Sequence, residues 1–436
     1  MKLLLSFRIA LLFTLFSISA QHIEAQFLMD MIDTTQDVGK GLLSIYKRFD
    51  HIRISGYIQP QFQVASQKGV KSFNGGDFPD HVDNRFMLRR GRLRFDYARF
   101  NDHNQPVLQF VFQFDGTERG VFARDFWGRY FENKWELFAV TAGMFARPFG
   151  YELNLASSDR ESPERGRMSQ ILMKVERDLG AMITFEPRSK NHPLRYFKLD
   201  AGIFNGQGLT GPNEYDGYKD FISRLALKPQ YLSKNTTISA GLSLMEGGLI
   251  QNTKYIYRTA TDNSNKTFAV DSSLNNIGNK APRKYRGGDI QFKIKHGWGY
   301  TELRSEYWWG RQSSTATNTE TPGILTSDPV YIRKFNGAFF YLLQNIVDEH
   351  HQLGIKYDWY DPNTEVKGEE IGKAGTTINA ANIKYSTLSL GYNYYININL
   401  KLMLWYDIIK NESTALADYR GDIKDNIFTC RLQFRF

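Results

Sequence analysis

The chain has 436 residues, carries 55 Lys and Arg against 46 Asp and Glu, and has a formal net charge of +9. Its mean hydropathy of −0.44 argues against a polytopic helical membrane protein, which needs repeated apolar runs of about 20 residues. The single cysteine excludes a disulfide framework. Aromatic residues make up 14% of the chain, which also has 36 glycines. This composition is typical of the transmembrane β-barrel, a class that hydropathy does not detect.

The first segment has the pattern of a secretory signal peptide. Lys2 and Arg8 accompany a hydrophobic stretch that is followed by small residues. We therefore predict a signal peptide over residues 1–25, with cleavage after Ala20 or Ala25. The alternative is a single membrane anchor, but the apolar run is short and Arg8 interrupts it.

The rest of the chain divides into a short segment and a long barrel domain. Residues 26–50 are expected to form a periplasmic pre-barrel segment, whose apolar positions fit a short amphipathic helix, although a plain linker fits equally well. Over residues 51–436 apolar and polar residues alternate with period 2, the pattern of half-buried strands. An even number of strands closes a barrel, and sixteen leave a lumen wide enough for water. We predict sixteen strands, which start near residues 52, 86, 105, 121, 135, 178, 194, 219, 236, 286, 299, 332, 349, 382, 399 and 424.

The connecting segments support the barrel independently, because they alternate between short and long. Links on one side have seven residues or fewer, whereas those on the other side are mostly long and rich in Asn, Ser, Thr and Gly. Outer-membrane barrels have short periplasmic turns and long extracellular loops. The two longest loops are 146–177 and 247–285. The fourth strand is the least certain, since its residues fit either register.

The two faces of the strands predict which side meets lipid. The polar face carries Arg, Lys, Gln and Glu, which need water, so the apolar face is expected to point outward. Aromatic clusters near strand ends suit interfacial girdles, while Trp308 and Trp405 are expected to face the lumen. The chain ends on Phe436, preceded by apolar residues at alternate positions, which resembles the carboxy-terminal signal of outer-membrane barrels. The predicted fold class is all-β, a sixteen-stranded antiparallel transmembrane β-barrel.

The second strand carries the strongest candidate for a functional site. Arg90, Arg92 and Arg94 alternate along it and are expected to share one lumen wall, about 6.6 Å apart. Guanidinium groups keep their charge and offer forked donors to oxyanions, so a row of them in a pore favours anions. The inward-facing positions as a whole carry more basic than acidic side chains. The alternative is that these arginines pair with carboxylates and only solvate the wall.

The loop 146–177, the third on its side, is longer than a barrel needs, so a functional role is expected. It contains Arg147 and Arg165, and its basic residues alternate with acidic ones. We expect it to fold inward and narrow the pore. The alternative is a surface loop that points outward.

Several stretches together resemble one known family. They are Arg-Arg-Gly-Arg-Leu-Arg-Phe at 89–95, Gly-Met-Phe-Ala-Arg-Pro-Phe-Gly-Tyr-Glu at 143–152, Glu-Arg at 164–165 and Arg-Asp-Leu-Gly at 177–180. The family is the phosphate-selective porins O and P. The resemblance runs from about residue 50 to the carboxy terminus and is most specific between 85 and 205.

The resemblance implies a barrel in the outer membrane of a Gram-negative-type cell, usually a homotrimer, with its third extracellular loop folded inward. It also implies an arginine ladder that leads to an anion site. By resemblance, Arg90, Arg92 and Arg94 lie on the ladder wall, and Arg147 and Arg165 lie in the constriction loop. We identify no counterpart here of the Lys and Asp residues at the family's central phosphate site.

The sequence therefore predicts an outer-membrane porin through which small anions, phosphate-like oxyanions or other anionic solutes, diffuse passively. The alternatives are a general, non-selective porin and a plugged barrel that acts as a surface-binding or adhesive protein. Expected partners are further copies in a homotrimer, outer-membrane lipid and lipopolysaccharide, and the solutes, but no nucleic acid. No nucleophile and base pair stands out, so we predict no enzyme, and no cofactor or metal site.

Overall fold

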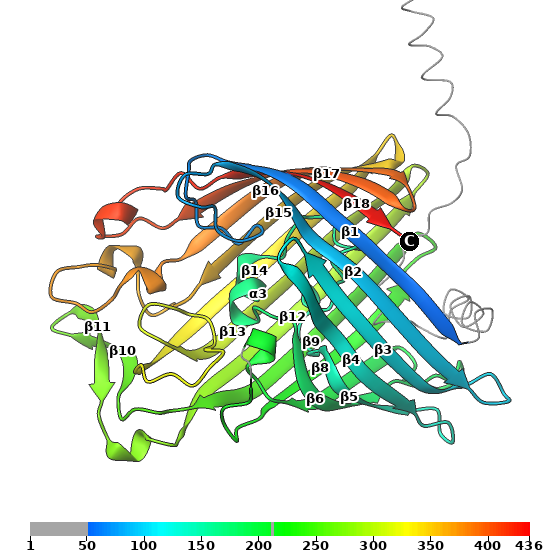
Figure 1. The fold of residues 1–436 in the computed structure, drawn as a ribbon, viewed down its shortest axis with the longest axis horizontal. Coiled ribbons are helices and arrows are strands. Elements are labelled where there is room, and N and C mark those ends of the chain that lie inside the picture. Colours follow the sequence, from blue (N-terminus) through cyan, green and yellow to red (C-terminus); the bar gives the residue numbers. More distant parts are fainter. Residues whose placement is uncertain (1–50, 211–212) are drawn as a thin grey trace, which may run out of the picture.

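The structure is a computed structural model that describes residues 51–210 and 213–436. The predicted signal peptide and the segment 26–50 lie outside the described residues. Sixteen antiparallel strands form a closed barrel, as the sequence predicts (Figure 1). In chain order they are β1 (Ile52–Ala65), β2 (Asn84–Phe100), β3 (Pro106–Thr117), β4 (Gly120–Phe131), β5 (Phe138–Ala146), β6 (Arg177–Phe185), β7 (Phe197–Phe204), β8 (Asp220–Tyr231), β9 (Thr236–Ile250), β12 (Lys280–His296), β13 (Gly299–Ser314), β14 (Val330–Ile346), β15 (Asp348–Asp361), β16 (Tyr385–Asn397), β17 (Leu400–Asn411) and β18 (Ile427–Arg435).

The barrel closes because its first and last strands pair. β1 pairs with both β2 and β18, and β9 pairs with β12 across a long outer loop. At the seam, the Phe436 amide donates to the Gly56 carbonyl (3.0 Å), and the Gly56 amide donates to the Phe436 carbonyl (3.2 Å). A closed sheet pairs its backbone groups internally and leaves no free edge.

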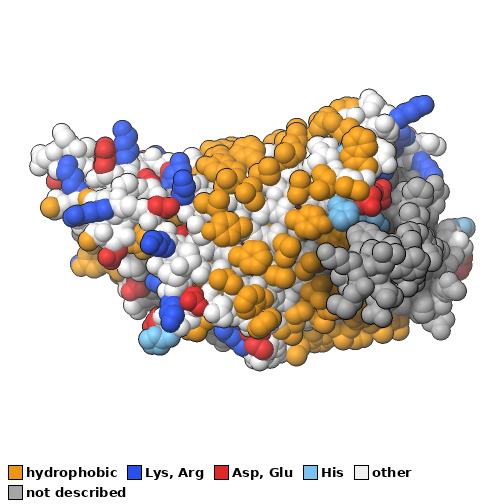
Figure 2. Space-filling view, turned by 90° about the horizontal axis from the view of Figure 1, so that it is seen from above, with side chains coloured by type: hydrophobic (Ala, Val, Ile, Leu, Met, Phe, Trp, Pro, Cys, Tyr) orange, Lys and Arg blue, Asp and Glu red, His pale blue; other side chains and the backbone are white. Residues whose placement is uncertain are grey.

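The outward face of the wall is apolar across its middle. Side chains such as Ile54, Phe112, Ile203, Leu242 and Leu353 are exposed there. Figure 2 shows a broad band of hydrophobic side chains across the middle of the barrel, with most charged side chains at the end that carries the long loops and a few at the opposite end. Because the surface that faces lipid must be apolar, this band marks the part of the wall that spans the membrane.

Long loops lie at one end of the barrel and turns that are mostly short lie at the other (Figure 1). The segment expected as an open loop at 247–285 is partly ordered: β9 and β12 extend into it, and it also forms a hairpin of β10 (Ile256–Asp262) and β11 (Asn265–Asp271). Asn263 and Ser264, both at positive φ, make its two-residue turn. β10 also pairs in parallel with the start of β14, which ties this hairpin to the barrel.

The described part of the chain has little helix. α3 (Arg167–Leu172) lies in the third outer loop. Short 3₁₀ turns are η1 (Gly208–Thr210), η2 (Leu274–Asn276), η3 (Gly368–Glu370), η4 (Ala380–Asn382) and η5 (Ala417–Tyr419). Across the described residues, no helix is both long enough and apolar enough to cross a bilayer.

A β-bulge explains why the fourth strand fits either register in the sequence. The pairing of β3 with β4 shifts there, so that Gln113 lies opposite Asp125 and Phe114 opposite Ala123. The extra residue, Arg124, forms ion pairs on the same side of the wall as buried Asp125. A bulge places two consecutive residues on one face, which interrupts the period-2 pattern.

Candidate functional site

The third outer loop, residues 147–176, lies against the inward face of the barrel wall. Glu161 accepts two hydrogen bonds from the Arg304 guanidinium on β13, at 2.6 and 2.8 Å. Asp159 accepts one from Arg435 on β18, at 2.8 Å. These wall arginines are on the face opposite to the exposed apolar side chains, so the loop occupies part of the lumen.

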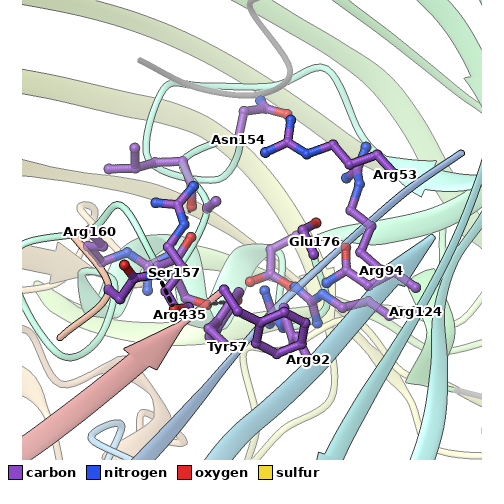
Figure 3. A pocket seen from close by; sticks show the side chains of 18 of the residues that line it. Arg53, Tyr57, Arg92, Arg94, Arg124, Asn154, Ser157, Arg160, Glu176 and Arg435 are labelled. Carbon is purple, nitrogen blue, oxygen red and sulfur yellow. Dashed lines mark hydrogen bonds and ion pairs between the residues drawn. The ribbon is translucent and has the colours of Figure 1, made fainter. Parts of the chain in front are cut away.

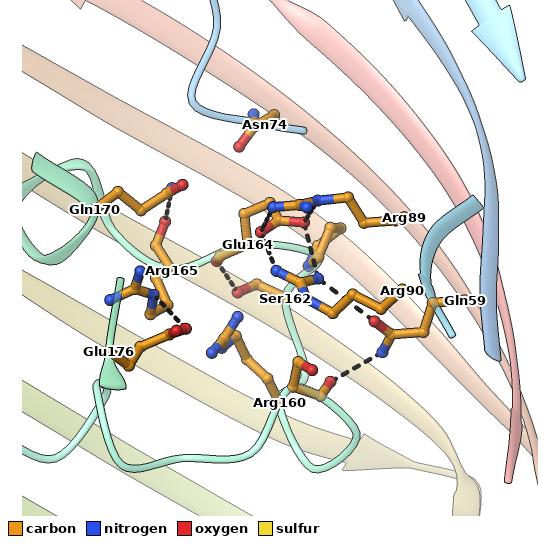
Figure 4. A network of polar contacts seen from close by, with 12 residues as sticks. Gln59, Asn74, Arg89, Arg90, Arg160, Ser162, Glu164, Arg165, Gln170 and Glu176 are labelled. Carbon is orange, nitrogen blue, oxygen red and sulfur yellow. Dashed lines mark hydrogen bonds and ion pairs between the residues drawn. The ribbon is translucent and has the colours of Figure 1, made fainter. Parts of the chain in front are cut away.

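Glu164 is held by three guanidinium groups, of which those of Arg89 and Arg90 are labelled in Figure 4. Its carboxylate lies 2.8 Å from Arg89 Nε, 2.7 Å from Arg90 Nη2 and 2.7 Å from Arg431 Nη2. The consecutive residues Arg89 and Arg90 both reach it because β2 has a bulge where its register against β1 shifts. Burial alone would raise the pKa of the Glu164 carboxyl, but these guanidinium groups outweigh burial and hold that pKa well below its usual value.

The wall also holds the backbone of the loop. The Glu306 carboxylate on β13 accepts hydrogen bonds from the amides of Tyr151 (3.1 Å) and Glu152 (2.8 Å). On β17, Lys401 Nζ donates to the carbonyl oxygens of Ser158 (3.2 Å) and Arg160 (3.0 Å). The loop is therefore attached to β13, β17, β18 and β2.

A cavity of about 210 Å³ remains between the loop and the wall formed by β1 to β4, β6 and β18. Its lining includes Tyr57, Asn154, Ser157 and Glu176 (Figure 3). Arginine dominates this lining, with Arg53, Arg92, Arg94, Arg124, Arg160, Arg177 and Arg435.

Most of these arginines are paired with carboxylates. The pairs are Arg92–Asp115 (3.1 Å), Arg94–Asp96 (2.8 Å), Arg124–Glu176 (2.8 Å), Arg177–Asp125 (3.0 Å) and Arg435–Asp159 (2.8 Å). Within residues 51–210 and 213–436, Arg53 and Arg160 form no such ion pair, and both have buried guanidinium nitrogens without a hydrogen-bond partner. Seven guanidinium groups thus meet five carboxylates, which leaves an excess of two positive charges and unfilled donors.

A smaller cavity of about 60 Å³ adjoins the first. The two share Arg94, Asn154 and Arg177 in their linings. The smaller one adds Lys198 and Arg224, from β7 and β8. Basic side chains therefore continue from one cavity into the next.

The three arginines of the predicted ladder lie in two different environments. Arg92 and Arg94 line the larger cavity. Arg90 is buried against Glu164 and is not among the residues that line either cavity. All three are paired with carboxylates, as the alternative interpretation of the sequence expects. Two of them also line the cavity, as the interpretation of a basic wall expects.

The two loop arginines of the prediction are buried within the loop's own contacts. Arg147 donates from Nη2 to the carbonyl oxygen of Val175. Arg165 donates from Nη1 to the carbonyl oxygens of Ser169 (3.2 Å) and Met173 (3.4 Å). Both arginines hold the loop in shape, and neither lines the two cavities.

Five further arginines, Arg53, Arg124, Arg160, Arg177 and Arg435, line the cavity but are not in the predicted site. Alternation places Arg53 and Arg435 on the lumen face, among the inward basic residues of the sequence, but it does not single them out as site residues. The bulge in β4 hides Arg124 from such an inspection. The positions of Arg160 and Arg177 depend on the path of the loop, which periodicity does not give.

Comparisons with known proteins agree with this architecture. Residues 350–436, from β15 to the end of the chain, match the family described as phosphate-selective porin O and P. The high pH structure of OprB from Pseudomonas putida has a TM-score of 0.53 at 10% sequence identity, over 92% of this chain and 98% of that chain. OmpT of Vibrio cholerae has a TM-score of 0.48 at 11% identity, over 88% of this chain and 99% of that chain. No curated protein matches the sequence.

The likeness to OprB is one of fold, because the identity is low. The family match adds evidence from the sequence itself, in the strands that close the barrel. With its sixteen strands, apolar outer band and polar lumen, the chain is an outer-membrane β-barrel with a porin-like fold, and its last four strands match the phosphate-selective porin O and P family.

Proposed function

We propose that this chain is an outer-membrane porin that prefers small anionic solutes and lets them diffuse passively between the third loop and the wall of β18 and β1 to β8. The observation that carries this proposal is the cavity of about 210 Å³ lined by seven arginines. The solutes that suit it are phosphate-like oxyanions and other small anions, because paired N–H groups of guanidinium match their oxygens. The family name points to phosphate as the first solute to test.

Two cavity arginines give the sharpest test of this proposal. Arg53 and Arg160 form no ion pair within the described part of the chain, and both have buried guanidinium nitrogens without a hydrogen-bond partner. Replacing both with Gln should lower the anion-to-cation permeability ratio about threefold or more, since charge acts strongly in a narrow passage of low dielectric constant. The measurement is the reversal potential of the purified protein in a planar bilayer under a KCl gradient.

The matched control replaces two exposed basic residues outside the cavity, Lys71 and Arg119, with Gln. This variant lowers the net charge by as much as the test variant does. It should leave the reversal potential unchanged, because the charges that it removes are outside the cavity. An unaltered protein that shows no preference for anions would instead be a general porin. A folded protein without any conductance would favour the plugged, surface-binding alternative.

We also propose that the protein assembles as a homotrimer, for which the structure of OmpT described as a trimer form is a precedent. The expected result is a slowly migrating species on gels run in mild detergent without heating, which converts to a monomer on heating. A species that migrates as a monomer in unheated samples would contradict the trimer.

A further inference from the structure

Three basic residues lie side by side on the outside of the barrel. Lys284 on β12 is directly opposite Arg311 on β13, and Arg311 is directly opposite Lys334 on β14. All three side chains are exposed. They lie near the ends of these strands that carry the long outer loops, and we call them the basic row.

An aromatic cluster lies on the same outward face, next to the basic row on its membrane side. Trp309 and Tyr307 follow Arg311 at alternate positions toward the loop-poor end and stack at 5.4 Å. Phe340 on β14 and Trp359 on β15 extend the cluster, with ring centroids 5.9 Å apart. Exposed Trp and Tyr mark the boundary between hydrocarbon and head groups, so the basic row lies at head-group level.

The charges of the row are only partly balanced. Lys284 is 3.1 Å from Glu246, and Lys334 is 2.7 Å from Glu365. Both pairs are exposed, and exposed pairs contribute little and exchange partners easily. Arg311 has no ion pair within the described part of the chain. Like charges directly opposite each other on neighbouring strands are unfavourable, so the row is more stable with an anion bound to it.

We propose that the basic row is a binding site for the phosphate groups of outer-leaflet lipid. The three residues lie on neighbouring strands, so the first and the last are two strand spacings apart, about 9.6 Å. This width suits the head group of a phosphorylated lipid. The acyl chains of the same lipid would lie along the aromatic and aliphatic wall below. This site is on the lipid side of the barrel and does not depend on the anion passage in the lumen.

The test measures binding of phosphatidylglycerol and phosphatidylcholine to the detergent-solubilised protein by native mass spectrometry. Replacing Lys284, Arg311 and Lys334 together with Gln should weaken binding of phosphatidylglycerol about tenfold or more, since each basic residue near a membrane surface attracts anionic lipid. Binding of phosphatidylcholine should change much less. The double variant Lys284→Arg and Lys334→Arg keeps the charge and should bind as the unaltered protein does.

The control variant replaces Lys71, Arg119 and Lys373, which are exposed in outer loops and are not part of the row, with Gln. Equal loss of phosphatidylglycerol binding in this variant would overturn the proposal. Competition by inorganic phosphate at concentrations like those of the lipid would also overturn it, because the row would then be a site for free anions. Heat-modifiable gel mobility confirms that each variant is folded.

Discussion

Replacing Glu164 with Gln should weaken the attachment of the third loop to β2 and β18 and strongly destabilise the folded protein. The change leaves Arg89, Arg90 and Arg431 without the carboxylate that they share. Removing one partner from a buried ion pair costs about 3 to 5 kcal/mol of folding free energy, because the remaining charge stays buried. Denaturant titration of the protein in lipid vesicles, followed by gel mobility, measures this loss.

The matched control is Glu365→Gln, which breaks the exposed pair with Lys334. It should cost about 1 kcal/mol or less, since solvent screens such pairs. Single-channel recording supplies a second measurement, because a loop held less firmly at β2 and β18 should make the Glu164→Gln current noisier. Equal stability of the two variants, with currents as steady as those of the unaltered protein, would show that Glu164 does not anchor the loop.

The anchor at Glu164 also shows what sequence periodicity can and cannot give. Alternation predicts that Arg90 points into the lumen, and its buried contact with Glu164 agrees. Alternation cannot place Arg89 beside it, because a bulge in β2 turns two consecutive residues to one side. It cannot pair Arg90 with Glu164 either, since 74 positions separate them and the path of the loop decides the contact.

The strands are predictable because each strand faces lipid on one side and the polar lumen on the other. A wall with lipid on one side and polar lumen on the other forces a period of 2, and the sixteen strands follow it. The outer hairpin of β10 and β11 has no such constraint, and it was expected as open loop. The sequence Asp-Asn-Ser-Asn at 262–265 was the signal for its turn, because Asn and Asp accept positive φ more readily than most residues do.

Within the lumen, the sequence predicts that the inward-facing side chains carry a net positive charge. It does not predict which of the arginines form ion pairs with carboxylates. Arg92 and Arg94 line the cavity as inward-facing residues of one strand. Arg53 and Arg160 matter most to the proposed selectivity, because carboxylates of the described chain leave them unpaired. Whether an arginine is paired depends on which acidic side chains lie near it in the folded protein. Neither the spacing of residues nor the composition predicts this.

Replacing Gly391 with Ala should disrupt the packing of Trp405 inside the barrel. Leu343, Gly354, Gly391 and Trp405 lie opposite one another on the four strands β14 to β17. The indole ring lies over both glycines, and a Cβ at Gly354 would already be 2.7 Å from it. A Cβ at Gly391 would overlap the ring, so Trp405 must move and give up its hydrogen bond to Asn393 (3.1 Å).

The expected loss of folding free energy is about 2 kcal/mol or more, at the upper end for an added methyl group in a packed interior. Gly297→Ala is the control, because a Cβ there meets no atom within 4 Å, and denaturant titration in vesicles compares the two variants.

The double variant Gly391→Ala and Trp405→Leu separates steric overlap from a general loss of strand stability. If overlap is the cause, the double variant loses less than the sum of the two single changes, because the smaller side chain leaves room for the methyl group. Additive losses would mean that Gly391 matters for a reason other than its contact with the ring.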